Sequence, residues 1–218
     1  STVEHVIQTA FYQDKFGRRP NCAIYYVGWN DIQNAHIAGL DPGFADFHMP
    51  GQIDWLRVRR VGGGNRRFSP LLTVIETLAV PMVDTIQYRS DPGKQKMGSG
   101  EDPRLTTIFE RNVRTISAIN RERGVPTIWV GQLVNRAALT GEGRYGWLPL
   151  VRDRDVWPML EGLRGVLARV AAETGDGLVN PPIESFGPAE FSDNGHFSQQ
   201  GARRFADTLA PLVKESCR

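Results

Sequence analysis

Apolar residues recur along this chain in two patterns, a helical spacing in some segments and short unbroken runs in others. Residues 2–16 place apolar side chains three to four positions apart, which predicts an amphipathic helix. The same spacing predicts helices from about 105 to a stop at Gly124, over 155–174, and from about 198 onward. The last of these helices is expected to face inward with Ala202, Phe205, Ala206, Leu209, Leu212 and Val213.

Three short runs are apolar almost throughout and do not alternate with polar residues. They span 22–27, 127–130 and 177–180, and the first is rich in Tyr, Ile and Val. Such runs are typical of strands buried on both faces of a parallel sheet. Because these strands alternate with helices, the sequence predicts an α/β fold with a parallel sheet.

Length and composition fit one domain over 1–218 with an elaborated insertion at about 33–102. The chain has 218 residues, of which 40% are hydrophobic, and a helix is expected within the insertion around 71–79. The formal net charge of +2 gives no indication of nucleic-acid binding. Basic side chains cluster from Arg57 to Arg67, where a solvated loop is the simpler interpretation and a rim for an anionic substrate the alternative.

Targeting and cysteine chemistry leave several questions open. No run is long and apolar enough to span a membrane and no signal peptide is recognisable, so a secreted, periplasmic or cytoplasmic location all fit. Cys22 and Cys217 lie at opposite ends of the chain without a metal-binding spacing, and whether they form a disulfide stays open. Nothing in the sequence calls for a metal ion or an organic cofactor.

The first run ends in Gly28-Trp29-Asn30-Asp31, which places an amide and a carboxylate at the end of a predicted strand. In parallel sheets, functional groups gather beyond the carboxyl ends of the strands. The Asn30 amide is therefore a candidate donor to an oxyanion, an interaction that is worth roughly 3 kcal/mol in a transition state. Asp31 would brace the loop. The alternative is an Asx turn that merely closes the strand.

A second cluster of polar residues precedes the last helix, where Asp193 and His196 are three residues apart. In a tight turn, this spacing lets the carboxylate accept a hydrogen bond from the imidazole, fix its tautomer and leave the other ring nitrogen as a base. The alternative is a turn cap beside a surface histidine. The remaining histidines, His5, His36 and His48, have no comparable partner pattern.

Together and in this order, the two motifs resemble those of the SGNH (GDSL-type) hydrolases, with a GxND block and a DxxH block. The resemblance implies a three-layer α/β/α, flavodoxin-like fold and a serine esterase, lipase or other acylhydrolase without a cofactor. His196 would be general base and then general acid, oriented by Asp193. Asn30 would stabilise the oxyanion, with Gly28 keeping the strand end clear, and Trp29 would line the substrate pocket.

The family's nucleophile, a serine in a GDS-like block after the first strand, has no counterpart here. Ser99 has glycine neighbours but follows the Asn30 block instead of preceding it. The chain thus resembles the C-terminal part of such a protein, and the first strands would lie on a missing N-terminal segment. That segment would supply the serine and pair with 23–27. Because each buried unpaired backbone group costs about 1–3 kcal/mol, we expect that residues 1–218 alone do not form a stable monomer.

The substrate is expected to be a small-molecule, glycan or lipid ester. Trp55 and the arginines Arg57, Arg59 and Arg60 are hypothesised to select it. Two other functions remain open: an inactive binding or structural module that keeps the SGNH-like fold, and an acyltransferase. An N-terminal nucleophile at Ser1 is disfavoured because such enzymes begin with a strand. A phosphate-binding flavodoxin-like domain is disfavoured because the Gly62–Gly64 run follows no clear strand. The oligomeric state stays open.

Overall fold

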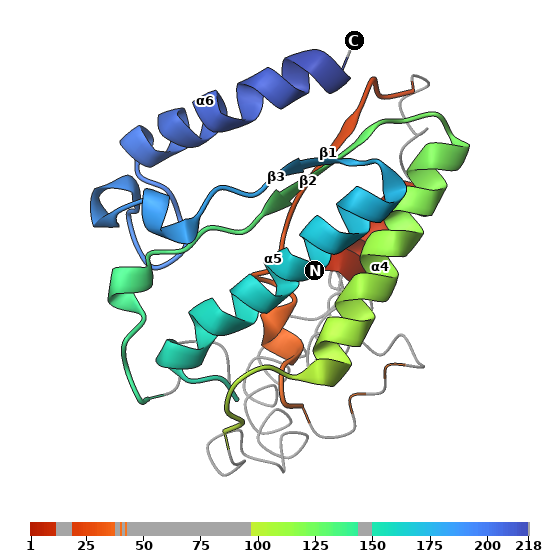
Figure 1. Cartoon of the computed structure of the whole chain (residues 1–218). Helices are drawn as coiled ribbons and strands as arrows, with labels where there is room; N and C mark the ends of the chain where they lie inside the picture. The colour runs from red at the N-terminus through yellow and green to blue at the C-terminus, as the bar shows by residue number, and fades with distance from the viewer. Residues whose placement is uncertain (12–18, 38–39, 41, 43–96, 144–149, 218) are drawn as a thin grey trace, which may run out of the picture.

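A computed structural model describes residues 1–11, 19–37, 40, 42, 97–143 and 150–217 (Figure 1). Most of the predicted insertion, the helix expected at 71–79, His48, Trp55 and the arginine cluster lie outside these residues. Within the described part, no helix is long and apolar enough to cross a membrane.

The centre of the fold is a parallel sheet of three strands in the order β1-β2-β3. The strands are β1 (Ala23–Val27), β2 (Thr127–Gly131) and β3 (Gly177–Val179). Ala23 lies opposite Thr127, and Ile128 lies opposite Gly177. All three carboxyl ends therefore meet at one edge of the sheet, and the predicted α/β fold with a parallel sheet is confirmed.

Helices cover both faces of this sheet (Figure 1). One face carries α4 (Pro103–Glu122) and α5 (Asp153–Thr174), and α1 (Thr2–Phe11) packs against α4. The other face carries α6 (Gln199–Ser216). The side chains of β2 alternate accordingly, with Trp129 in the core on the α4 and α5 side and Ile128 and Val130 in the smaller core under α6.

Local signals set the ends of the helices. The Asp102 side chain accepts a hydrogen bond from the backbone of Arg104 and caps α4, which begins with a proline. Ser198 caps α6 by accepting from the backbone of Gly201 at 3.2 Å. Helix α5 ends at Gly175, whose φ of 76° lies in the left-handed region that favours glycine.

Two burial predictions need correction. Strand β2 is fully buried as expected, but Ile24 in β1 is 44% exposed because β1 lies at the edge of the described sheet. In α6, Ala202 and Ala206 are exposed. Only the stripe through Phe205 and the leucines meets the sheet, so the two alanines lie beside the contact.

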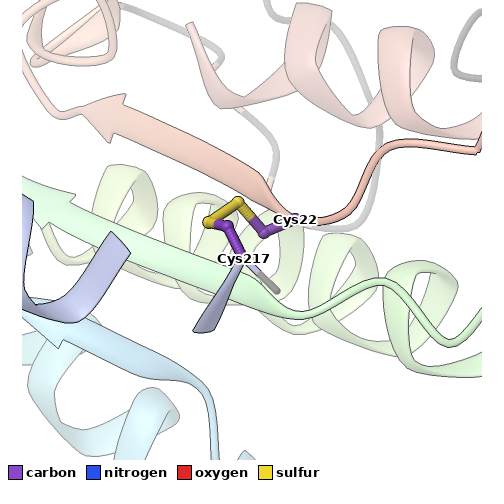
Figure 2. The surroundings of a disulfide bond; sticks show 2 residues. All are labelled: Cys22 and Cys217. Atoms are coloured by element: carbon purple, nitrogen blue, oxygen red, sulfur yellow. A yellow bond between two sulfur atoms is a disulfide. The ribbon is translucent and has the colours of Figure 1, made fainter. Parts of the chain in front are cut away.

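A disulfide joins Cys22, just before β1, to Cys217, which ends α6 (Figure 2). Their Cα atoms are 4.9 Å apart. The bond therefore fastens the last helix to the start of the first strand, and it answers a question that the sequence left open.

Candidate active site

The turn after β1 is shaped by Gly28. Its φ of 133° lies in a region that is strained for other residues, and its carbonyl accepts from the backbone of Asp31 at 3.0 Å. A Cβ at this position would lie 3.2 Å from the Leu160 side chain and 3.3 Å from Cβ of Gln132. Both backbone conformation and packing therefore require a glycine where the strand ends.

Asp31 anchors the far side of the same turn. Its Oδ1 accepts from the backbone N–H of Thr2 at 2.9 Å and from the Thr2 hydroxyl at 2.6 Å. The Thr2 hydroxyl in turn accepts from the Asn112 amide at 3.0 Å. Asp31 is buried, and this burial raises the pKa of its carboxyl group. The turn is thus tied to the start of α1 and to α4, as expected for a residue that braces the loop.

Asn30 lies between these two anchors and is exposed. Its side-chain carbonyl accepts from the Gln33 amide at 3.2 Å. Among the described residues, no backbone N–H donates to it, so Asn30 does not form the Asx turn that was the alternative explanation. Within the same part of the chain, the N–H groups of its amide have no acceptor and can bind a ligand.

Asp193 and His196 are hydrogen-bonded as predicted. Nδ1 of His196 lies 2.7 Å from Oδ2 of Asp193, and Oδ1 accepts from the backbone N–H groups of Gly195 and His196, both at 2.8 Å. These backbone bonds, and the bond to the ring, lower the pKa of Asp193 to about 2. The carboxylate is therefore ionised at neutral pH and can only accept, which places the ring proton on Nδ1 and leaves Nε2 free to accept a proton.

The loop that carries this pair is held at several points. Phe191 and Phe197 form an antiparallel bridge, and Asn135 donates its backbone N–H to the carbonyl of Asn194 at 3.0 Å. A Cβ on Gly195 would lie 3.4 Å from the Trp29 ring, so the loop packs directly on the turn after β1.

Gly201 lets the first turn of α6 approach this loop closely. A Cβ at that position would lie 1.9 Å from the backbone oxygen of Glu190. Ser198 adds a hydrogen bond from its hydroxyl to the carbonyl of Ala189 at 2.8 Å. The start of α6 is therefore fixed against the segment that precedes Asp193.

The two motifs share a cavity of about 680 Å³ at the carboxyl ends of β1 and β2. Its described lining contains Trp29, Asn30, Asp193 and His196, which the sequence singled out, whereas Gly28 is not part of it. Sequence reasoning missed the other lining residues, which are Tyr26, Gln132, Asn194, Gly195 and Phe197. The rule that functional groups gather at strand ends would have found Gln132, which directly follows β2.

None of these lining residues carries an aliphatic hydroxyl or a thiol. Of the nearest serines in the sequence, Ser192 donates its hydroxyl to the carbonyl of His196 at 3.1 Å, and Ser198 caps α6. Within the described residues, no group of three or more His, Cys, Asp and Glu side chains is placed to hold a metal ion.

Comparison of the chain with protein-family models, with curated proteins and with solved structures gives no match. The chemistry of the site therefore rests on its geometry. The cavity offers a base with a bound carboxylate, an amide N–H donor and several aromatic rings. General-base and oxyanion groups of this kind surround the reacting carbonyl in acyl-transfer enzymes.

Proposed function

We propose that this chain forms the base side and the oxyanion side of a serine ester hydrolase with a three-layer α/β/α fold of the SGNH (GDSL) type. One observation carries the proposal: Asn30 and the Asp193–His196 pair, which lie far apart in the sequence, line the same cavity. A turn cap and a surface histidine would not need to meet an amide donor at the carboxyl end of the sheet.

In this mechanism a serine hydroxyl attacks the ester carbonyl while Nε2 of His196 accepts its proton. Asp193 stabilises the imidazolium that forms, and the Asn30 amide donates to the tetrahedral oxyanion. The histidine then returns the proton to the leaving alcohol. Water hydrolyses the acyl-enzyme through the same histidine.

We place the nucleophilic serine on a segment outside these 218 residues. The edge of β1 supports this placement. The backbone N–H of Ala23 donates toward β2, to Pro126 at 2.8 Å. In a strand, the backbone groups of neighbouring residues point to opposite sides, so those of Ile24 and Tyr26 face the other edge. No described strand pairs with this edge, so a further strand can pair there and deliver its carboxyl end to the same cavity.

The test is covalent labelling of the protein, isolated from its source, with a fluorophosphonate, followed by intact mass measurement. We expect one adduct on a serine, on a species heavier than this chain. A His196→Ala variant should label at least about a hundredfold more slowly because the hydroxyl loses its base. The proposal would be overturned if the protein isolated from its source has the mass of these 218 residues and forms no adduct.

A second function is supported by the absence of an alcohol or thiol among the described lining residues. A protein that keeps the cavity without a nucleophile would be a binding module. It would bind an ester of suitable shape and leave it intact. Such a protein would give no fluorophosphonate adduct, and His196→Ala would change its affinity for the ester without any effect on turnover. An acyltransferase would instead form the adduct and pass the acyl group to an added alcohol.

A further inference from the structure

Gln132 lies at the wall of the cavity, and its side-chain amide has no hydrogen-bond partner among the described residues. The residue follows β2 directly, is 9% exposed and lines the cavity. In the described part of the structure the backbone carbonyl of Gln132 accepts a hydrogen bond from Arg164, whereas its side chain forms none. Its amide therefore meets the cavity with its hydrogen-bonding capacity unused.

The surrounding contacts hold the backbone of Gln132 and its Cβ in place at the cavity wall. Nη1 of the buried Arg164 donates to the Gln132 carbonyl at 3.1 Å, and the next backbone N–H, of Leu133, donates to the Tyr26 hydroxyl at 3.1 Å. Gly28, in the turn after β1, packs against Cβ of Gln132. The start of the Gln132 side chain is therefore fixed beside the cavity, and its amide can reach a ligand there.

An amide carries a donor and an acceptor side by side, and its natural complements are a hydroxyl group or another amide. Apart from Asp193, Gly195 and His196, the other lining residues of the cavity are of two kinds. Tyr26, Trp29 and Phe197 contribute aromatic rings, and Asn30 and Asn194 contribute further amides. The described lining contains no lysine or arginine. Rings beside neutral amides match a molecule with apolar C–H faces and hydroxyl edges.

We propose that Gln132 binds a hydroxyl group of the substrate, so that the ester is one of a polyhydroxy alcohol such as a sugar and not of a hydrocarbon alcohol. This inference rests on the proposed ester hydrolysis. An alkyl ester would remove the amide from water without giving it a partner, and sites built to hydrogen-bond a hydroxyl discriminate strongly against analogues that lack it.

The test compares the hydrolysis of methyl 6-O-acetyl-glucoside with that of hexyl acetate by the whole protein. We expect kcat/KM of the wild type to be at least about tenfold higher for the sugar ester. Gln132→Leu, which keeps the size of the side chain, should lower kcat/KM for the sugar ester about tenfold, mainly through KM. It should leave hexyl acetate unchanged or better. Gln8→Leu, the same change on the exposed surface of α1, should alter neither.

An equal loss on both esters in Gln132→Leu, or a wild-type preference for hexyl acetate, would overturn the inference. If the wild type hydrolyses neither ester, the proposed function fails, and binding then decides the role of Gln132. In an NMR titration with methyl glucoside, binding by the wild type that is lost in a folded Gln132→Leu variant supports the inference. No binding, or unchanged binding in the variant, overturns it.

Discussion

The disulfide between Cys22 and Cys217 closes a loop of 195 residues, which is most of the chain. In the chain-entropy model, a cross-link over a loop of this length lowers the entropy of the unfolded chain by about 18 cal/mol/K. This amounts to about 5 kcal/mol of stability at 25 °C. Domains are usually stable by only about 5–15 kcal/mol. Opening this bond should therefore remove a large share of the free energy of unfolding.

The perturbation is the double variant Cys22→Ala/Cys217→Ala. A protein of this length has an unfolding entropy of about 0.46 kcal/mol/K at its midpoint, so a loss of about 5 kcal/mol lowers Tm by about 11 °C. Thermal unfolding followed by far-UV circular dichroism measures this shift. The wild type in the presence of a reductant should have the same Tm as the double variant, and the Tm of the oxidised wild type should be well above both.

The result that refutes the reasoning is a double variant whose Tm lies within about 2 °C of the oxidised wild type. A non-reduced peptide map with two free thiols would refute the bond itself. A matched measurement separates global from local effects. Cys217 follows α6 and His196 precedes it, and the helix between them is about 27 Å long. Well below Tm, the NMR signals of the His196 ring should therefore be the same in both proteins.

The other predictions concern the two motifs. Asn30→Ala should lower kcat roughly a hundredfold with little change in Tm, because among the described residues its exposed side chain is hydrogen-bonded only to Gln33; unfolding would instead show a structural role. Asp193→Asn should lower kcat roughly a thousandfold or more in steady-state assays of a folded variant, and unchanged kcat would refute the orienting role. The Asp193 carboxylate should stabilise the loop fully above pH ~4 and lose this effect as the pH falls through about 2. The NMR signal of the Gly195 amide, followed against pH, measures this titration. A titration midpoint near 4 would contradict the prediction. Burial raises the pKa of Asp31, so its carboxyl group contributes most to the free energy of unfolding at low pH, and this contribution declines as the pH rises above ~4. In denaturant titrations, Asp31→Asn should therefore gain stability relative to the wild type between about pH 4 and 7. A difference in stability that does not change with pH would contradict this.

Helical periodicity predicted α4, α5 and α6 to within a few residues, because each buries one apolar stripe. The predicted starts of α4 and α5 lie two residues after the observed ones. Asp102 and a proline begin α4 before its first apolar residue, and α5 begins at Asp153, ahead of its own apolar stripe. Strand burial was harder to predict, because an apolar run does not show how many neighbours a strand has. Strand β2 has two and is buried, whereas β1 has one within the described sheet and exposes Ile24.

The hydrogen bond between Asp193 and His196 could be predicted because both groups belong to one short turn. The remaining cavity members could not be named with the same ease. Gln132 and Tyr26 come from two strands that are adjacent only in the folded sheet, and Phe197 reaches them through the bridge to Phe191. The pairing of Cys22 with Cys217 likewise depends on where α6 ends, which no local pattern contains.

The sequence offered two interpretations of Asp193, a cap of the turn and the partner of the His196 ring. In the structure each interpretation applies to one of the two oxygens of the carboxylate. Oδ1 caps the turn through the backbone of Gly195 and His196, and Oδ2 binds the ring. An asparagine at this position keeps an acceptor for the turn but replaces the second oxygen with an NH₂ group, which cannot accept the Nδ1 proton. It therefore separates the two roles, whereas an alanine would remove both. Loss of turnover in a correctly folded Asp193→Asn protein would consequently assign the second oxygen to catalysis and leave the turn to the first.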